Sequence, residues 1–339
     1  MKQNILCVGE TLVRLSTQVG VHFYDTISLN LNYGGAEANV AINLANLGHK
    51  TTYFTKVPNN QLGQTAIKNT QKYGVDASHV IYGGNRIGSY YLEAGAGPRA
   101  ANIIYDRAHS AISEMKVDEI NFEELLEGKS MLHITGITAA LSKDSAEVTY
   151  QLIKAAKEKG LVVNFDVNFR SKLWSVEECA VFLKRVLPYV DYLSAGKLDA
   201  INFLGVKELD PDQTTTEIEQ LDYYFGKIHE LYPNIQIFYA TIRNVISATH
   251  NTLQGAFWKD GITYYSKIQD MDHIIDRIGG GDAFAAGVLH GILENYDPEY
   301  TINFATALSS LKHTIYGDVS PFTVEQAERT MTHDARVDR

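Results

Sequence analysis

The chain has 339 residues, of which 45% are hydrophobic and 21% are charged, and its formal net charge at pH 7 is −10. This composition is that of one large globular domain. The negative charge argues against a nucleic-acid partner, because binding a phosphate backbone needs a basic face. No apolar run reaches the length of a membrane span and the N-terminus lacks a secretory signal, so we expect a cytoplasmic protein without a membrane partner.

Cysteine and histidine do not suggest a metal centre. Cys7 and Cys179 form no CxxC pair and lie in apolar surroundings, which is typical of buried thiols in a reducing compartment. The eleven histidines are scattered without metal-ligand spacing. We therefore expect no transition metal held by the protein itself.

Apolar strand patterns alternate with helical patterns along most of the chain. Strands are predicted at 4–9, 51–57, 131–136, 161–166, 189–194 and 235–241, and helices at 36–48, 63–73, 144–158 and 176–187. This alternation predicts an α/β fold, with a mostly parallel sheet covered by helices on both faces. Ligands bind such sheets beyond the carboxyl ends of the strands.

Two stretches interrupt the alternation. Residues 11–33 and 86–107 carry period-2 patterns without a helix between them. We expect them to form a small antiparallel β-sheet that serves as a lid, a contact between subunits, or both. Together with the main sheet they make one domain over residues 1–330, followed by a polar tail at 331–339.

The first glycine motif follows the first of these stretches. Gly34 and Gly35 open a helix and permit close backbone approach to a ligand, with Asn39 directed into the same site. On its own the motif is equally consistent with a helix that begins with a loose cap.

The second glycine motif is the run DRIGGGDAFAAG at 276–287. Gly279, Gly280 and Gly281 precede an apolar helix, so their amides and the helix dipole predict a phosphate site. Asp282 at the helix start is a candidate general base for a substrate hydroxyl. The alternative is a glycine turn with Asp282 as its N-cap.

The two motifs together resemble the signatures of the ribokinase-like (PfkB) carbohydrate kinases, and the resemblance covers about residues 3–325. That family carries DTxGAGDxFxxG, from which this chain departs at Arg277 and Gly280. The resemblance implies the ribokinase-like fold, ATP and Mg²⁺ as cofactors, Asp282 as the base and the three glycines around the transferred phosphoryl group. Asp276 would bind a sugar hydroxyl.

Three further segments resemble the 2-keto-3-deoxygluconate kinases within that family. They are GSYYLE at 88–93, YDRAHSA at 105–111 and DVNFRSKLW at 166–174. The substrate is then a sugar acid, and arginine matches carboxylate geometry. We predict Arg107 and Arg170 as carboxylate ligands, with Tyr90 and Tyr105 as phenol donors. The alternative is that both arginines are solvated surface charges.

The resemblance also suggests nucleotide-binding residues. Thr241 and Arg243 occupy the Thr-x-Gly position of the family, and the further candidates are Ser247, Gly255 and Asn303. Each is equally consistent with a cap or core role. The family's Asn-x-x-Glu motif is replaced by Gly196-Lys197-Leu198-Asp199, which puts a metal role of that loop in doubt.

These patterns predict an ATP-dependent kinase that phosphorylates the primary hydroxyl of a sugar acid, as a homo-oligomer built through the lid. One alternative is a kinase for a neutral sugar or a nucleoside, in which Arg107 and Arg170 are bystanders. Another is a sugar-binding homologue without activity, against which the intact Asp282 and glycine loop argue.

Overall fold

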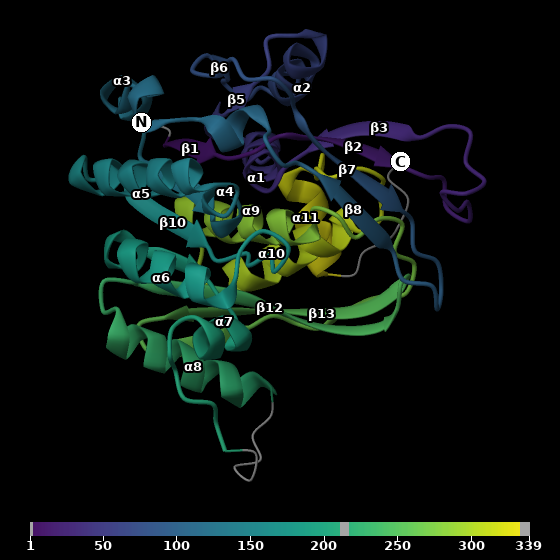
Figure 1. Ribbon diagram of the computed structural model, residues 1–339. Helices are drawn as coiled ribbons and strands as arrows, with labels where there is room; N and C mark the ends of the chain where they lie inside the picture. Colours follow the sequence, from purple (N-terminus) through teal and green to yellow (C-terminus); the bar gives the residue numbers. More distant parts are fainter. Residues whose placement is uncertain (1–2, 211–216, 333–339) are drawn as a thin grey trace.

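The computed structural model describes residues 3–210 and 217–332, and a nine-stranded sheet forms its centre. Six strands run parallel in the order β12, β11, β10, β9, β1, β4, and β13, β14 and β15 add antiparallel pairings beyond β12 (Figure 1). Their bounds are β1 Asn4–Val8, β4 Lys50–Phe54, β9 Met131–Thr135, β10 Val162–Asp166, β11 Tyr192–Ser194, β12 Ile237–Ser247, β13 His250–Lys259, β14 Ile262–Tyr265 and β15 Gln269–Met271.

Helices cover both faces of this sheet, which confirms the predicted α/β architecture. One face packs against α5 (Lys143–Glu158), α6 (Val176–Val186) and α8 (Glu217–Leu231). The other face packs against α1 (Ala36–Asn46), α9 (Gly280–Leu293) and α10 (Pro298–Lys312). The remaining helices are α2 Gln61–Gln71, α3 Phe122–Leu126, α4 Gly136–Ala139, α7 Lys197–Asn202 and α11 Val324–Met331, with single 3₁₀ turns at 111–114, 117–119 and 187–189.

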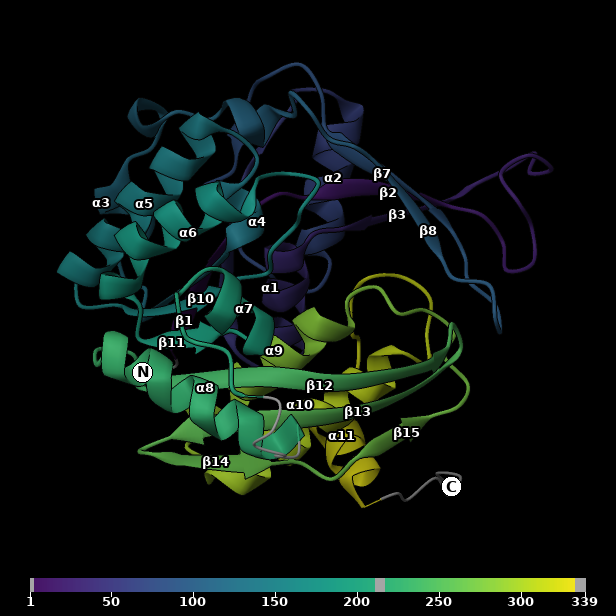
Figure 2. The same ribbon diagram turned by 60° about the horizontal axis from the view of Figure 1, so that its bottom comes forward.

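A second, four-stranded sheet projects from this body (Figure 2) and is called the lid below. Its order is β3 (Asn30–Gly34), β2 (Leu12–Ser16), β7 (Gly88–Glu93), β8 (Asn102–Asp106), and these strands lie in the two segments expected to form it. The outer pairings are antiparallel, whereas the central β2–β7 pairing is parallel. The relative direction of two strands whose paired residues, such as Leu12 and Gly88, are 76 positions apart has no local sequence signal, which is why the expectation of an all-antiparallel sheet missed it. A two-stranded parallel pair, β5 (Lys56–Val57) with β6 (Ile81–Tyr82), flanks the lid.

The hairpin of β12 and β13 is longer than predicted. We expected a strand ending at residue 241, but β12 continues to Ser247 and pairs along its length with β13. The additional residues, 242–247, are exposed or only partly buried and include Arg243 and Asn244, so no apolar run marks them.

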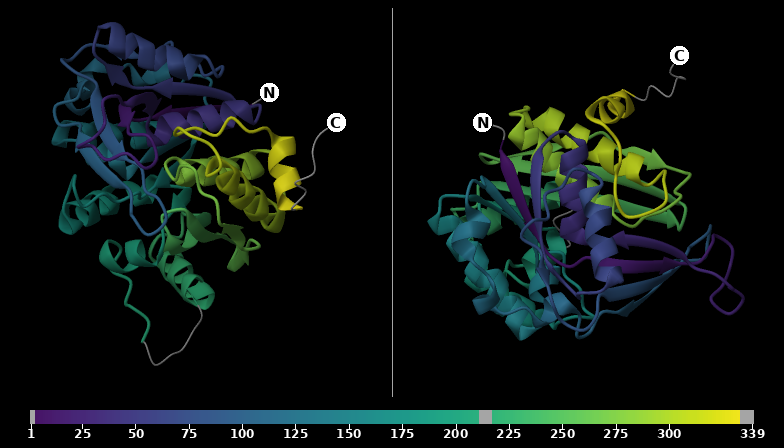
Figure 3. Two further views of the ribbon diagram at one scale, coloured as in Figure 1. Left: turned by 90° about the vertical axis from the view of Figure 1, so that its right-hand side faces the viewer. Right: turned by 90° about the horizontal axis from the view of Figure 1, so that it is seen from above.

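The C-terminal helix α11 lies against α10, where Ala327 packs with Phe304 and Leu308 (Figure 3). Most of the predicted polar tail, from 333 to 339, lies outside the described residues. Within the part of the chain that the structure describes, no helix combines the length and apolarity needed to span a bilayer.

Gly255 lies on β13, where that strand packs tightly against the helices, and a substitution there tests how closely the core is packed. A Cβ atom there would lie 2.5 Å from the Thr306 hydroxyl oxygen, 2.7 Å from Ile302 Cδ1 and 2.8 Å from Phe284 Cε2. Overpacking of this kind costs about 1–3 kcal/mol. Gly255→Ala should lower the free energy of unfolding by that amount in urea denaturation.

Gly226 supplies the matched control. It lies within α8, and a Cβ atom there would meet nothing within 4 Å. Gly226→Ala should leave stability unchanged or raise it by about 0.5–1 kcal/mol, because alanine favours a helix over glycine. Equal effects of the two substitutions would contradict the packing at Gly255.

Candidate active site

A cavity of about 580 Å³ lies where the carboxyl ends of the parallel strands meet the lid and the start of α9. It is lined by the lid, the start of α1, the loop before α9 and the ends of β10 and β12. The sequence-predicted residues on its wall are Gly35, Asn39, Tyr90, Tyr105, Arg107, Arg170, Thr241, Arg243, Gly279, Gly281 and Asp282. Residues drawn from segments across the whole chain therefore converge on one site.

A second lobe of about 880 Å³ opens from this cavity beneath the ends of β10, β11 and β12. Asp166, Asn168, Thr241 and Arg243 line both lobes, which makes them one continuous cleft. Residues 194–199 form the far wall of the second lobe.

Asp282 has the environment of a general base. Asn39 Nδ2 donates a 2.6 Å hydrogen bond to its Oδ2. Burial raises the pKa of Asp282 to about 7; the Asn39 hydrogen bond opposes this rise, and nearby Asp166, Asp318 and Glu37 add to it. A carboxylate with a pKa near neutrality can accept a proton from a hydroxyl efficiently. Asn39 thus holds the Asp282 carboxylate in place, a contact that the sequence analysis did not assign to it.

The three glycines before Asp282 differ in what they do. Gly279 has φ 82° and a Cβ atom there would lie 1.7 Å from the Asp318 carbonyl oxygen, so both backbone conformation and contact require glycine. A Cβ on Gly280 would meet the His313 ring at 2.3 Å. Gly281 faces open space. In the first turn of α9 the Gly280 amide donates to the Arg277 carbonyl oxygen at 3.4 Å. The amides of Gly281 and Asp282 have no acceptor among the described residues and no side chain caps the helix, so these two are available to an anion.

Asp166 and Glu37 add further buried carboxyl groups to the wall. Burial raises the pKa of Asp166 to about 7, despite a Ser194 hydrogen bond and the charge of Arg170. Glu37 accepts hydrogen bonds from the hydroxyls of Thr135 and Thr138, both at 2.7 Å, and burial raises its pKa. The site therefore holds several carboxyl groups that compete to remain ionised.

Asp276 does not line the cavity, which corrects its predicted role in sugar binding. Its Oδ2 accepts hydrogen bonds from Arg14 at 2.5 Å and from the Gly317 amide at 3.1 Å. Arg14 also donates to Asp318 at 2.7 Å, and the Tyr90 hydroxyl donates to Asp318 at 2.6 Å. Asp318 is the residue of this group that reaches the cavity together with Tyr90.

Arg107 also forms an ion pair with a carboxylate of the protein, that of Glu10. Its Nε donates to Glu10 Oε2 at 2.8 Å, a second guanidinium nitrogen pairs with the same oxygen, and Ser110 donates to Glu10 Oε1. Only 8% of Arg107 is exposed. Arg107 lines the cavity, and its role in binding a substrate carboxylate stays a prediction, with two of its donor nitrogens already occupied by Glu10.

Three other arginines line the cavity without a carboxylate partner among the described residues: Arg170, Arg243 and Arg277. Arg170 is exposed and donates to the carbonyl oxygens of Asn168 and Phe169. Arg243 has a buried Nε with no hydrogen-bond partner. Burial and the charge of Arg277 lower the pKa of Arg243 to about 10. Arg243 and Arg277 are therefore close enough for their positive charges to repel one another. Such a pair on a cavity wall favours binding of a highly charged anion.

The predicted nucleotide residues divide into two groups. Thr241 and Arg243 lie on the cleft, whereas Ser247, Gly255 and Asn303 line neither lobe. Gly255 is a packing residue of the core, which corrects its assignment. Asn303 accepts a hydrogen bond from the Lys267 amide at 3.0 Å. Gly34 also lies off the wall, because Asp318 fills the space beside it.

The Gly196–Asp199 loop begins α7. Asp199 accepts a 2.7 Å hydrogen bond from the Gly196 amide, so its carboxylate caps the helix. Burial raises its pKa. Lys197 and Asp199 both line the second lobe.

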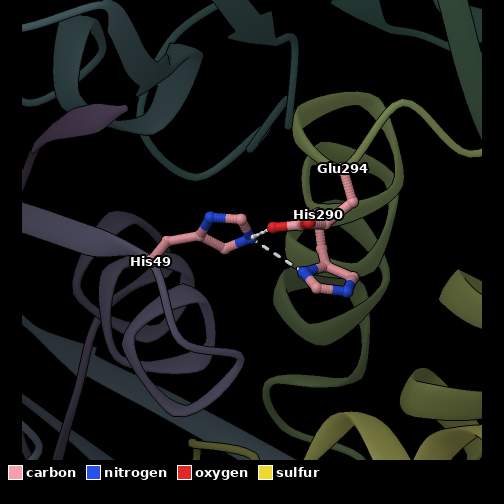
Figure 4. Close-up of side chains that lie close together, drawn as sticks. All are labelled: His49, His290 and Glu294. Carbon is pink, nitrogen blue, oxygen red and sulfur yellow. Dashed lines mark hydrogen bonds and ion pairs between the residues drawn. The ribbon is translucent and has the colours of Figure 1, made fainter. Parts of the chain in front are cut away.

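The structure brings His49, His290 and Glu294 together (Figure 4), outside the residues that line the cleft, although these three residues show no metal-ligand spacing along the chain. His49 Nε2 lies 2.7 Å from His290 Nδ1 and 3.9 Å from Glu294 Oε1. Two nitrogen ligands on tetrahedral zinc stand about 3.3 Å apart, given bonds of about 2.0–2.1 Å. The shorter separation is that of a hydrogen bond between the two rings.

Sequence reasoning missed Arg14, Glu10, Glu37 and Asp318 as site residues. Glu10 follows a strand end that was recognised as polar, which was its one signal. Arg14 and Asp318 lie 304 residues apart and belong to no motif, so only the fold brings them together.

Comparisons with known proteins agree with this geometry. The model of the pfkB family carbohydrate kinases matches residues 2–324. A PfkB family carbohydrate kinase from Listeria grayi is 42% identical with a TM-score of 0.92, over 97% of this chain and 100% of that one. A 2-dehydro-3-deoxygluconokinase from Thermotoga maritima is 37% identical with a TM-score of 0.92, over 97% and 99%. A 2-dehydro-3-deoxygalactonokinase from Haloferax volcanii is 31% identical over the full length of both chains. The chain belongs to the pfkB family of carbohydrate kinases.

Proposed function

We propose that the protein transfers the γ-phosphoryl group of ATP to the primary hydroxyl of 2-keto-3-deoxygluconate and forms the 6-phosphate. The observation that carries the proposal is one cavity that holds a base with a raised pKa at a helix N-terminus beside three arginines without carboxylate partners. A kinase for a sugar acid needs all of these parts, because both of its substrates are anions.

The acceptor hydroxyl lies against Asp282 in this proposal. Asp282 accepts its proton as the oxygen attacks phosphorus, and Asn39 holds the carboxylate in place through its 2.6 Å hydrogen bond. The first-turn amides of α9 stabilise the charge on the phosphoryl oxygens. Gly281, which faces open space, leaves room for the phosphate.

Arg170 is the proposed ligand of the substrate carboxylate. It lines the cavity on the side of the lid, where Tyr105 and Ile103 also lie, and none of the described acidic groups is paired with it. Arg107 acts indirectly in this proposal, because its hydrogen bond to Glu10 holds that carboxylate on the cavity wall. The relatives from Thermotoga maritima and Bacillus subtilis named 2-dehydro-3-deoxygluconokinase support this substrate, since that name denotes the same acid.

Arg243 and Arg277 are the proposed ligands of the triphosphate. Arg243 lies where the two lobes join, which supports a nucleotide in the second lobe with its phosphates toward Asp282. Mg²⁺ prefers oxygen ligands and keeps part of its water shell. Asp166 and Asn168, which line both lobes, are the residues that would hold it, and it would neutralise phosphate charge when bound.

The C4 epimer is a second candidate substrate. The Haloferax volcanii relative, which matches over its full length, is named for the galactonate form. The neutral-sugar alternative has less support, because it leaves Arg170 without a function in the cavity.

We also propose that the lid closes over the acceptor and joins two subunits. It contributes Leu12, Tyr90 and Tyr105 to the cavity, and exposes Leu31 and Ile104 at 50% each. Exclusion of water by the lid would suppress hydrolysis of ATP.

Replacing the base tests the mechanism. Asp282→Asn keeps the size of the side chain but removes the proton acceptor, so kcat should fall by about 10²–10⁴. Calorimetry should show that sugar acid and nucleotide still bind. Asp191→Asn is a control, because Asp191 is a buried carboxylate that pairs with Lys157 outside the cleft. It should reduce stability but not turnover, and near-native turnover of Asp282→Asn would exclude the assignment.

The pH dependence of the reaction follows from the raised pKa of Asp282. The base acts when ionised, so kcat/KM should be constant above a pH of about 7 and fall toward tenfold per pH unit below it. Because Asp166 titrates in the same range, the observed value belongs to the coupled pair. A profile that stays flat down to pH 5 would contradict this environment for Asp282.

Substrate selectivity tests Arg170. Arg170→Leu should raise the KM for the sugar acid about tenfold or more, since loss of a charged partner costs at least 1–3 kcal/mol. Weak activity on fructose should change little. Arg170→Lys should recover part of the loss, because lysine lacks the planar fork. Arg185→Leu, at an exposed arginine on α6, should have no effect. A parallel loss for both sugars in Arg170→Leu would assign Arg170 to folding.

A further inference from the structure

Lys312, the last residue of α10, is fully buried, with 0% of the residue exposed. Its ammonium donates to the carbonyl oxygen of Asp276 at 3.1 Å and to that of Ile315 at 3.4 Å. It does not line the cleft, so it touches neither substrate in the arrangement proposed above.

A buried ammonium is costly unless nearby groups compensate its charge. Burial lowers the pKa of Lys312, whereas the charges of Asp276, Asp318 and Asp282 favour its protonated form. Asp276 and Asp318 share Arg14 as their ion-pair partner. One guanidinium cannot balance two carboxylates, and the ammonium of Lys312 supplies the second positive charge.

The two carbonyl oxygens belong to segments that meet below the glycine loop. The amides of Ile275 and Asp276 both donate to the carbonyl oxygen of His313, at 2.8 and 3.3 Å. The ammonium reaches across the same junction from the other segment. Asp276 is three residues before Gly279, the N-cap residue of α9. A shift at Asp276 would therefore move the amides and the base together.

We propose that Lys312 is a positioning residue for phosphoryl transfer, and that its ammonium acts as a tethered monovalent cation which fixes the backbone before the glycine loop. The carbonyl oxygens of Asp276 and Ile315, with the carboxylates nearby, form the cation cage. The inference rests on the proposed kinase function. It predicts that the wild-type enzyme needs no free monovalent cation.

Chemical rescue tests this inference. Lys312→Ala removes the ammonium and leaves space beside the two carbonyl oxygens. With whichever sugar the wild type phosphorylates, kcat should fall tenfold or more, while the KM for that sugar should change less than threefold. Ammonium chloride should restore kcat of the variant several-fold and in a saturable manner. Choline chloride at the same ionic strength should not.

A control variant separates this effect from general loss of a buried lysine. Lys56 is 8% exposed and pairs with Glu119 away from the cleft. Lys56→Ala should lose stability without a response of kcat to ammonium. Thermal unfolding of Lys312→Ala without substrates should shift upward in ammonium relative to choline, whereas the wild type should not. The thermal-unfolding measurement does not depend on the identity of the sugar.

Two results would overturn the inference. One is a folded Lys312→Ala enzyme with wild-type kcat, or with reduced kcat and no response to ammonium in rate or thermal unfolding. The other is a wild-type enzyme that is inactive in choline buffer until ammonium or potassium is added. The assay of the wild-type enzyme in choline buffer can be made even if Lys312→Ala does not fold. Failure of the wild type to phosphorylate any sugar acid would instead reject the proposed substrate.

Discussion

One guanidinium joins the lid to the segment before the glycine loop. Arg14 lies on β2 of the lid and donates to Asp276, before the glycine loop, and to Asp318, beyond α10. Tyr90, on the neighbouring lid strand β7, donates to the same Asp318. The position of the lid relative to Asp282 therefore depends on a buried ion-pair network. Removing one partner of such a network leaves an uncompensated buried charge, which is strongly destabilising.

The distribution of charge in the cleft follows from this network. Arg14 and Lys312 balance Asp276 and Asp318, and Arg107 balances Glu10. Among the described residues no cation forms an ion pair with Asp282 or Asp166, although the charge of Arg170 acts on Asp166, and burial moves both pKa values to about 7. Arg170, Arg243 and Arg277 are the complementary unpaired cations. The cavity wall therefore carries both ion-paired groups and ionisable groups with strongly shifted pKa values, and the latter are expected of a functional site.

The sequence predicted the parts of the fold that depend on local pattern. The glycine run, the apolar helix α9 and the alternation of strands and helices are local, and the structure contains them. Asp276 was assigned to the sugar from the family resemblance, but its carboxylate binds Arg14, which lies 262 residues away and which no local pattern connects to it. Arg107 was assigned to the substrate from the resemblance of its segment and the fit of arginine to a carboxylate, and its partner Glu10 is 97 residues away. Long-range charge pairing decides which arginine or carboxylate remains available, and a single sequence does not show such pairing.

The central claim is that the cleft distinguishes an anionic sugar from a neutral one. The most direct measurement compares kcat/KM of the wild-type enzyme for 2-keto-3-deoxygluconate, its C4 epimer and fructose with ATP as donor, and identifies the phosphorylated carbon by NMR. The account predicts phosphorylation at C6 and an efficiency for at least one of the two acids that exceeds that for fructose by about tenfold or more, the factor set by 1.4 kcal/mol of carboxylate recognition. Equal efficiencies for acid and neutral sugar, or a product phosphorylated elsewhere, would contradict it.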